Sequence, residues 1–401
     1  MNSEKLVPKL RFDGFDDEWV KTSLGDISSD EMYGMNSAST EYDGLNKYIR
    51  ITDISETSNK FIPNPLTSPD GTLEEKYKLK TGDIVFARTG ASTGKTYLYD
   101  ENDGNLYFAG FLIKFHVDNA YHKFIFYNTL KEEYKNWVCV MSVRSGQPGI
   151  NSNEYKKLPM YLPSFKEQEK ISKFIESIDN KINLLEQKHH YYQDFKKYLM
   201  QQIFTQKSRF NNYNDNWNET KIKNIAEVVG GGTPKTDIDS YWNGDIKWYT
   251  PSEIGKTKYI TDSERHITED GLKNSSAKLL PKNTILLSSR ATVGEVSITL
   301  TECSTNQGFQ SLITKNNVDT EFIYYLISNI KNEFLRRSSG STFLEISKNE
   351  IKKIRINIPS LNEQKEIGKV LSNTDEKIFY LEESINKTQE FKKGLLQQMF
   401  V

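Results

Sequence analysis

Residues 163–171 read PSFKEQEKI, and this stretch returns at residues 359–367 as PSLNEQKEI. The register between the two copies holds without a gap as far as residues 195–204, FKKYLMQQIF, and residues 391–400, FKKGLLQQMF. A repeat of this kind predicts two copies of one structural element within a single chain.

Each copy has the pattern of one long helix. Proline is followed by a serine suited to the N-cap, and Glu167 or Glu363 stands three residues later, which predicts a capping box. Apolar or partly apolar positions then recur in steps of three and four, the heptad spacing of a coiled coil. The positions of this seam are Ile171, Ile175, Ile178, Ile182, Leu185, His189, Tyr192, Lys196, Leu199 and Ile203, and Ile367, Leu371, Thr374, Ile378, Leu381, Ile385, Thr388, Lys392, Leu395 and Met399. An uninterrupted helix of about 40 residues is about 60 Å long.

The two predicted helices can bury their apolar stripes against each other. Exposing five heptads to water is costly, so we expect an antiparallel coiled coil that gives the chain a pseudo-two-fold internal repeat. Lys196 and Lys392 at seam positions are expected to help fix the register. The alternative is that each block is an ordinary long core helix.

The segments that precede the two helices also repeat, but only in part. Markers around Arg11 to Ile27 correspond to markers around Arg209 to Ile225, whereas most of the intervening residues differ. We therefore predict an α+β protein with two mixed α/β domains separated by two helices. The boundaries are 1–162 for the first domain, 163–207 for the central helix, 208–358 for the second domain and 359–401 for the C-terminal helix.

Composition restricts the class of protein. With 27% charged and 36% hydrophobic residues in 401, no apolar run suited to a membrane span and no apolar signal core near the start, the chain is expected to be cytoplasmic. Cys139 and Cys303 lie far apart without metal-ligand spacing, so neither a disulfide framework nor a zinc site is expected. The net charge of −1 counts against a protein that binds DNA alone.

Both predicted domains contain a short strand pattern that leads into an arginine and a loop of small residues. The strands are expected at residues 83–87 and 284–288, the arginines are Arg88 and Arg290, and later helices are expected to be capped by Asp118 and Asp319. Loops rich in Arg, Ser, Thr, Gln and Gly suit DNA, because these side chains contact base edges and phosphates. The predicted DNA-contact residues are Arg88, Thr89, Ser92, Thr93, Lys95, Arg144, Gln147, Thr233, Lys235, Arg290, Thr292, Arg336, Arg337 and Thr342. For any one arginine, the alternative is a surface salt bridge or a hydrogen bond that braces its loop.

Signatures of catalysis are missing from the sequence. Residues 90–96, GASTGKT, resemble a phosphate-binding loop, but only three residues separate the glycines where the motif needs four. No histidines have metal spacing, and no glycine-rich cofactor loop opens a βαβ unit. We therefore expect a binding protein with no catalytic residues, no metal and no cofactor of its own.

At this point the chain resembles the specificity subunits of type I restriction-modification enzymes. The resemblance rests on two variable halves, each followed by a Pro-Ser-x-x-Glu-Gln-x-x-Ile helix that ends in Phe-Lys-Lys…Leu…Gln-Gln…Phe. The stretch from Gly231-Gly232-Thr233-Pro234 to Trp248 also resembles a frequent opening of that family's recognition domains. The first half departs from this opening and has residues 30–34, DEMYG, in its place.

The resemblance implies that each body reads one half of a bipartite site in double-stranded DNA while the helix pair sets the spacer. Two modification subunits carrying S-adenosylmethionine dock on the helices and methylate adenine, and restriction subunits cleave DNA with ATP and Mg²⁺. The helix-end residues implied for partner binding are Phe195, Leu199, Phe204, Phe391, Leu395 and Phe400. Two other classes remain open: a stand-alone DNA-binding regulator and a coiled-coil scaffold.

Overall fold

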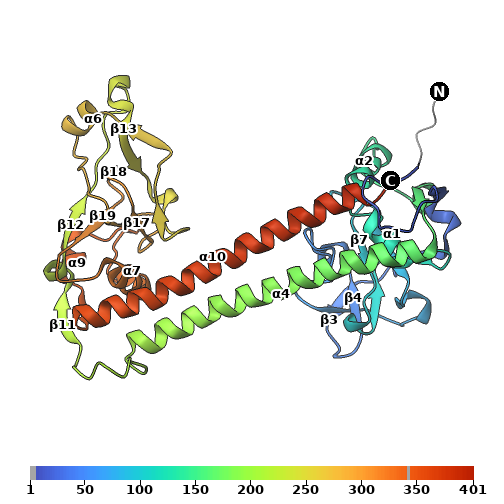
Figure 1. The fold of residues 1–401 in the computed structure, drawn as a ribbon, viewed down its shortest axis with the longest axis horizontal. Helices are drawn as coiled ribbons and strands as arrows, with labels where there is room; N and C mark the ends of the chain where they lie inside the picture. Colours follow the sequence, from blue (N-terminus) through green and yellow to red (C-terminus); the bar gives the residue numbers. More distant parts are fainter. Residues whose placement is uncertain (1–5, 341–343) are drawn as a thin grey trace. The chain divides into compact units, whose positions relative to one another are not determined.

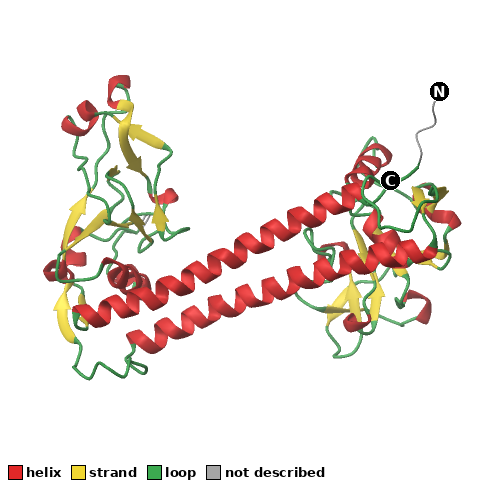
Figure 2. Cartoon of the chain, in the orientation of Figure 1, coloured by secondary structure: helices red, strands yellow, loops and turns green. Residues whose placement is uncertain are grey.

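The computed structural model describes residues 6–340 and 344–401. The chain divides into two compact units: unit 1 comprises Met1–Glu186 and Glu383–Val401, and unit 2 comprises Gln187–Glu382. Figure 1 traces the chain through them, and Figure 2 shows that both contain helices and strands. The mixed helix and strand content that the sequence predicts is confirmed.

The two repeated blocks are long helices. Helix α4 spans Phe165–Phe204 and α10 spans Leu361–Gln398, with 40 and 38 residues. The boundaries between the units divide both helices, so each unit holds the first part of one and the last part of the other. Every predicted seam position is buried or half-buried. The apolar stripe is therefore covered along both segments of each helix.

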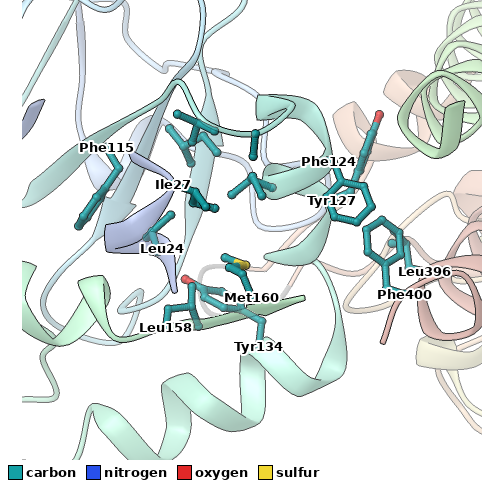
Figure 3. Close-up of a cluster of buried hydrophobic side chains, with 14 of the residues drawn as sticks. Leu24, Ile27, Phe115, Phe124, Tyr127, Tyr134, Leu158, Met160, Leu396 and Phe400 are labelled. Carbon is teal, nitrogen blue, oxygen red and sulfur yellow. The ribbon is translucent and has the colours of Figure 1, made fainter. Parts of the chain in front are cut away.

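Unit 1 is built around a four-stranded antiparallel sheet in the order β2–β9–β6–β7. The strands are β2 (Ser28–Tyr33), β6 (Asp83–Ala87), β7 (Thr96–Leu98) and β9 (Leu112–Val117), and the helices are α1 (His122–Asn128), α2 (Glu132–Met141) and α3 (Ser152–Lys156). Phe400 stacks on Phe124 of α1, with ring centroids 4.9 Å apart (Figure 3). The chain thus completes the core of unit 1 with residues from just beyond α10.

Unit 2 repeats this plan with one further strand. Its main sheet has the order β12–β19–β16–β17–β14, and α7, α8 and α9 follow in the chain as α1, α2 and α3 do in unit 1. The elements are β12 (Ala226–Gly230), β14 (Tyr259–Ile260), β16 (Ile285–Leu287), β17 (Val296–Thr299), β19 (Gln310–Thr314), α7 (Thr320–Asn329), α8 (Lys331–Arg336) and α9 (Lys348–Lys353). Two predicted strands are thereby confirmed, as β6 and β16.

Smaller sheets complete both units. In unit 1 the pairs are β1 (Val20–Ser23) with β10 (Pro159–Leu162), β3 (Ser39–Glu41) with β5 (Thr67–Pro69), and β4 (Lys47–Ile49) with β8 (Leu106–Phe108). In unit 2, β11 (Asn218–Lys221) pairs with β20 (Arg355–Ile358), and β13 (Trp242–Tyr249) lies between β15 (Arg265–Ile267) and β18 (Cys303–Thr305). The short helices α5 (Ile222–Ile225) and α6 (Glu269–Lys273) also belong to unit 2.

The repeated Glu-Gln pair joins each long helix to its unit. The Gln168 amide oxygen accepts from the Tyr121 N–H at 2.9 Å, and its nitrogen donates to the Pro163 carbonyl at 2.9 Å. Gln364 makes the same two bonds, from Asp319 N–H and to the Pro359 carbonyl, again at 2.9 Å each. Because these glutamines are almost fully buried, their amides satisfy backbone groups that water cannot reach.

The predicted capping boxes are wrong in the role of the glutamates, whose side chains bond to arginines and not to the backbone N–H of the N-cap serine. Glu167 forms a two-bond ion pair with Arg11, at 2.8 Å for each bond, and Glu363 does the same with Arg209 at 3.0 and 2.7 Å. A buried carboxylate needs a cation more than a backbone N–H, and the arginine fork fits its two oxygens. Each glutamate therefore fixes the segment around Arg11 or Arg209 against the start of a long helix.

One of the two predicted helix caps is confirmed. The Asp319 carboxylate accepts from the Phe322 N–H at 2.9 Å and caps α7. The cap at Asp118 is wrong, because α1 begins at His122 with Tyr121 at its N-cap position. Asp118 instead accepts a bond from the Ser29 hydroxyl at 2.7 Å.

Candidate functional site

A short loop, called the turn below, joins two neighbouring strands of the main sheet in each unit. The turn after β6 closes with Ala87 N–H donating to the Lys95 carbonyl at 2.8 Å, and the turn after β16 closes in the same way between Ser288 and Glu295 at 2.9 Å. A glycine before each closing residue lies close to a helix. A Cβ on Gly94 would be 2.5 Å from a Val138 methyl of α2. The helix therefore fixes where the turn lies.

A second loop, just before α3 or α9, is bonded to the start of each turn. Ile150 N–H donates to the Arg88 carbonyl at 2.9 Å, and Ile346 N–H donates to the Ser289 carbonyl at 3.1 Å. Arg88 therefore corresponds to Ser289 and not to Arg290. The predicted matching of Arg88 with Arg290 is wrong by one residue, because the turn that follows Arg88 is longer.

Arg88 lies between two aromatic rings. Its guanidinium carbon is 5.1 Å from the centre of the Tyr33 ring and 5.8 Å from that of Phe111. Its Nε donates to the Gly110 carbonyl at 3.0 Å. Tyr33 and Phe111 are 41% and 59% exposed, so solvent reaches this cluster. Sequence reasoning missed both aromatic residues, because neither is near Arg88 in the chain.

The other four predicted arginines all have carboxylate partners. Arg144 pairs with Glu154 at 2.5 Å and also donates to the Met141 and Val143 carbonyls. In unit 2, Arg290 pairs with Glu345 at 2.9 Å, while Arg336 and Arg337 both pair with Glu333. These arginines thus also brace their loops, the alternative that the sequence left open. Among the described residues, Arg88 alone of the five has no carboxylate partner.

Lys95 is largely buried and has partners within the chain. Its side chain is only 8% exposed, and its ammonium group donates to the Ile54 carbonyl at 3.1 Å and pairs with Glu56. The lysine thus joins the turn to a neighbouring segment, and its contact with DNA stays a prediction. In the same turn, Thr93 donates to the Gly90 carbonyl at 2.7 Å. Thr89 and Ser92 are half-buried, and Gln147 is exposed.

The predicted contacts of unit 2 are more scattered. The Thr233 hydroxyl donates to the Gln307 side chain at 2.5 Å. Lys235 and Thr292 are exposed. Thr342 lies outside the described residues.

The predicted partner-binding residues divide into two groups. Phe195 and Phe391 are 37% and 57% exposed on the long helices. Leu395 and Phe400 are buried in the core of unit 1, while Leu199 and Phe204 pack against the core of unit 2. These four side chains are thus wholly or partly covered within this chain, and partner contact stays a prediction for all six. Exposed aromatic residues of the long helices that the sequence analysis did not select include Phe165, Tyr191, Tyr198, Phe379 and Tyr380.

Among the described residues, no three His, Cys, Asp or Glu side chains gather in a way that could hold a metal ion. No helix in the described part of the chain has the length and apolarity needed to cross a membrane.

Comparison with known proteins identifies relatives over both units. The family model described as type I restriction modification DNA specificity domain matches residues 16–191 and 214–390. The type I restriction enzyme MjaIX specificity subunit of Methanocaldococcus jannaschii is 42% identical over 188 residues, which cover 46% of this chain and 43% of that protein. The EcoR124I/EcoR124II specificity subunit of Escherichia coli is 24% identical over 271 residues, covering 63% of each chain. The matches thus span less than two thirds of these two relatives.

Solved structures share the fold across nearly the whole chain. The S subunit of a type I restriction-modification system from M. genitalium has a TM-score of 0.62 at 15% identity, with 98% of this chain and 99% of that chain covered. The HsdS subunit from Thermoanaerobacter tengcongensis has a TM-score of 0.52 at 17% identity, with 96% and 97% covered.

Proposed function

Since the chain belongs to the family of type I restriction modification DNA specificity domains, we propose that it is the DNA-recognition subunit of a type I restriction-modification complex. The observation that carries this proposal is a duplicated frame with different contents. Both units have the same core of sheet strands and the same Glu-Gln contacts, yet Arg88 of unit 1 corresponds to Ser289 of unit 2. Two different surfaces on one frame suit two different half-sites.

The paired helices are proposed to set the distance between the half-sites. Two ion pairs support an antiparallel coiled coil: Lys392 with Asp179 in unit 1, and Lys196 with Asp375 in unit 2. The lysines are at the seam positions predicted to fix the register, and polar seam residues with matched partners specify register.

The chemistry is proposed to belong to partner subunits. Two modification subunits with S-adenosylmethionine would methylate adenine in each half-site, and restriction subunits would use ATP and Mg²⁺ to cleave. Phe195 and Phe391, exposed on the two long helices, are the proposed partner contacts that remain accessible. Positive charge from the modification subunits would offset the near-neutral net charge of this chain.

A stand-alone regulator and a scaffold are the competing functions. A regulator needs tight binding by a chain without a basic surplus, which the net charge of −1 disfavours. A scaffold gives no reason for different polar groups at corresponding strand ends. The duplicated frame favours the specificity subunit over both.

The direct test is genome-wide detection of N6-methyladenine in cells with and without this chain, alongside its modification subunit. The expected result is a bipartite motif with a fixed gap that disappears on deletion. An unchanged methylation pattern, in cells shown to express the partner, would favour the regulator or the scaffold.

A second experiment tests the role of the helices. One heptad is inserted into both α4 and α10 at the boundaries between the units, which adds about 10 Å, or roughly three base pairs. A longer accepted gap, or loss of binding through the wrong helical phase, is expected. A matched control places seven residues after Gly71, an exposed loop position where an added Cβ would have no neighbour within 4 Å. An unchanged gap in the helix variant contradicts the proposal that the helices set the distance between the half-sites.

A further inference from the structure

Both units have a corresponding position where three strand ends of the main sheet meet, which we call the strand-end site. In unit 1, Tyr33 pairs with Ile113, and Arg88 N–H donates to the Phe111 carbonyl at 3.0 Å. In unit 2, Gly230 pairs with Gln310, and Ser289 N–H donates to the Gly308 carbonyl at 2.7 Å. The site therefore consists of four corresponding residues, Tyr33, Arg88, Phe111 and Ile113 in unit 1 and Gly230, Ser289, Gly308 and Gln310 in unit 2.

In unit 1 the site holds a pre-oriented arginine. The Arg88 Nε donates to the Gly110 carbonyl. The two terminal nitrogens, Nη1 and Nη2, have no hydrogen bond or ion pair to the described residues. The Tyr33 and Phe111 rings restrict the guanidinium, and the Tyr33 hydroxyl is itself held by the Ser152 N–H at 3.2 Å. An arginine held in this way loses little conformational entropy when it binds.

The free pair of terminal nitrogens has a specific chemical match. Guanine presents O6 and N7 side by side in the major groove, and an arginine fork donates one bond to each. A surface arginine that served only to brace a loop would have a carboxylate or carbonyl on these nitrogens, as Arg144 does. Arg88 has neither there among the described residues.

In unit 2 the same site has different chemistry. Ser289 is fully buried and its hydroxyl has no hydrogen-bond partner among the described residues, and the same holds for the buried amide oxygen of Gln310. Glycines replace both aromatic residues, so the Gln310 amide lies over Gly230, where a Cβ would be 3.5 Å from its oxygen. This site has no arginine fork.

We propose that Arg88 reads a guanine in the half-site of unit 1, that Tyr33 and Phe111 position it, and that the strand-end site of unit 2 does not select guanine through an arginine. The inference rests on the proposed function and deepens it, since it assigns a base to one side chain and divides the labour between the two units.

The first test compares methylation motifs of the wild type, Arg88→Ala, Arg88→Lys and Arg355→Ala, each as the full chain with its modification subunit. We expect Arg88→Ala and Arg88→Lys to relax one G·C pair in one half of the motif and to leave the other half unchanged. The unchanged half also reports that the variant is folded. Arg355→Ala removes an exposed arginine that pairs with Glu219, and as the control it keeps the full motif.

The inference is overturned if Arg88→Ala retains every base of the motif, or if both halves weaken equally. A wild type without any bipartite motif would instead contradict the proposed function, so the two failures are distinguishable.

Binding measurements decide the case in which Arg88→Ala abolishes methylation. Each guanine of the wild-type motif is replaced in turn by 7-deazaguanine, which lacks N7, and at one of them the wild-type complex is expected to lose about 10- to 100-fold in affinity. Arg88→Ala binds more weakly but shows no further loss with the modified base. Equal losses in both proteins overturn the assignment. Phe111→Leu, which loosens the guanidinium, is expected to lower affinity while the sensitivity to 7-deazaguanine remains.

Discussion

Lys392 of α10 pairs with Asp179 of α4, with 2.5 Å between Nζ and Oδ1. The same carboxylate accepts a bond from the Tyr127 hydroxyl of α1 at 3.0 Å, and the lysine lies 5.5 Å from the centre of the Tyr127 ring. Burial raises the pKa of the Tyr127 phenol, so the hydroxyl keeps its proton and remains a donor. One cluster therefore ties both long-helix segments of unit 1 to α1.

Unit 2 has the same cluster. Lys196 pairs with Asp375 at 2.6 Å, Asp375 accepts from the Tyr325 hydroxyl at 2.5 Å, and Lys196 lies 5.4 Å from the Tyr325 ring centre. Both lysines are the seam residues of the repeated motif, so the duplication preserves the cluster along with the helix.

Replacing Lys392 by methionine is expected to destabilise unit 1. The substitution keeps most of the apolar stem but leaves Asp179, which is 30% exposed, without its cation, at a cost of about 1–3 kcal/mol. The free energy of unfolding from denaturant titration measures the effect. Lys393→Met changes the neighbouring residue on the helix and serves as the control. Equal stability of the two variants would contradict a structural role for the pair.

Replacing Gln168 by alanine is expected to cost about 2–4 kcal/mol, because two buried backbone groups lose their hydrogen-bond partner. Hydrogen exchange at the start of α1 should accelerate as well, since the Tyr121 N–H loses its acceptor. Gln201→Ala, at an exposed position of the same helix, is the control. Unaltered exchange at Tyr121 would show that the amide does not hold α1.

Replacing Gly94 by alanine is expected to lower the free energy of unfolding by about 1–3 kcal/mol. Gly94 has φ +91°, and the added methyl would meet Val138 at 2.5 Å. Gly44→Ala is the matched control, because Gly44 also has positive φ (+88°) and its Cβ position has no neighbour within 4 Å among the described residues. If both substitutions have the same effect, the contact between the turn and α2 is not tight.

The two cysteines are expected to react very differently with a thiol reagent. Cys139 is exposed, whereas burial raises the pKa of the Cys303 thiol to about 12. At pH 8 one thiol per chain should react quickly, and the second only after unfolding; Cys139→Ser should remove the fast phase.

The raised pKa also predicts a pH dependence of stability. An unfolded thiol releases its proton above the ordinary value of 9.0, while the folded one keeps it to about 12. The free energy of unfolding should therefore fall as pH rises through this window. Cys303→Ala should show a weaker decline between pH 9 and 10, and an identical decline would exclude the thiol as its source.

The sequence predicted the long helices well because a heptad stripe is a local signal with a fixed period. It failed at the capping boxes, since nothing near Glu167 reveals that Arg11 will reach it from the other end of unit 1. Similarly, Leu395 is an apolar residue near the end of α10 and Phe400 lies just beyond the helix, and sequence alone does not distinguish a partner contact from a contribution to a distant core.

At the candidate site, residue type was informative but position was not. The rule that arginines in loops suit DNA selected Arg88 together with four arginines that have carboxylate partners. Only the fold reveals the aromatic rings beside Arg88, because β2 and the start of β9 bring Tyr33 and Phe111 there from separate parts of the chain. The difference in turn length between the units likewise concealed that Arg88 corresponds to Ser289.

The stacking of Phe400 on Phe124 has a consequence for biosynthesis. Unit 2 is one continuous segment and can fold once residue 382 has left the ribosome, whereas unit 1 needs residues from 383–401 to fill its core. The part of the chain that is translated first is thus completed last. A nascent chain that stops short of these residues leaves the Phe124 side of unit 1 uncovered, exposing apolar surface of the kind that chaperones and proteases recognise.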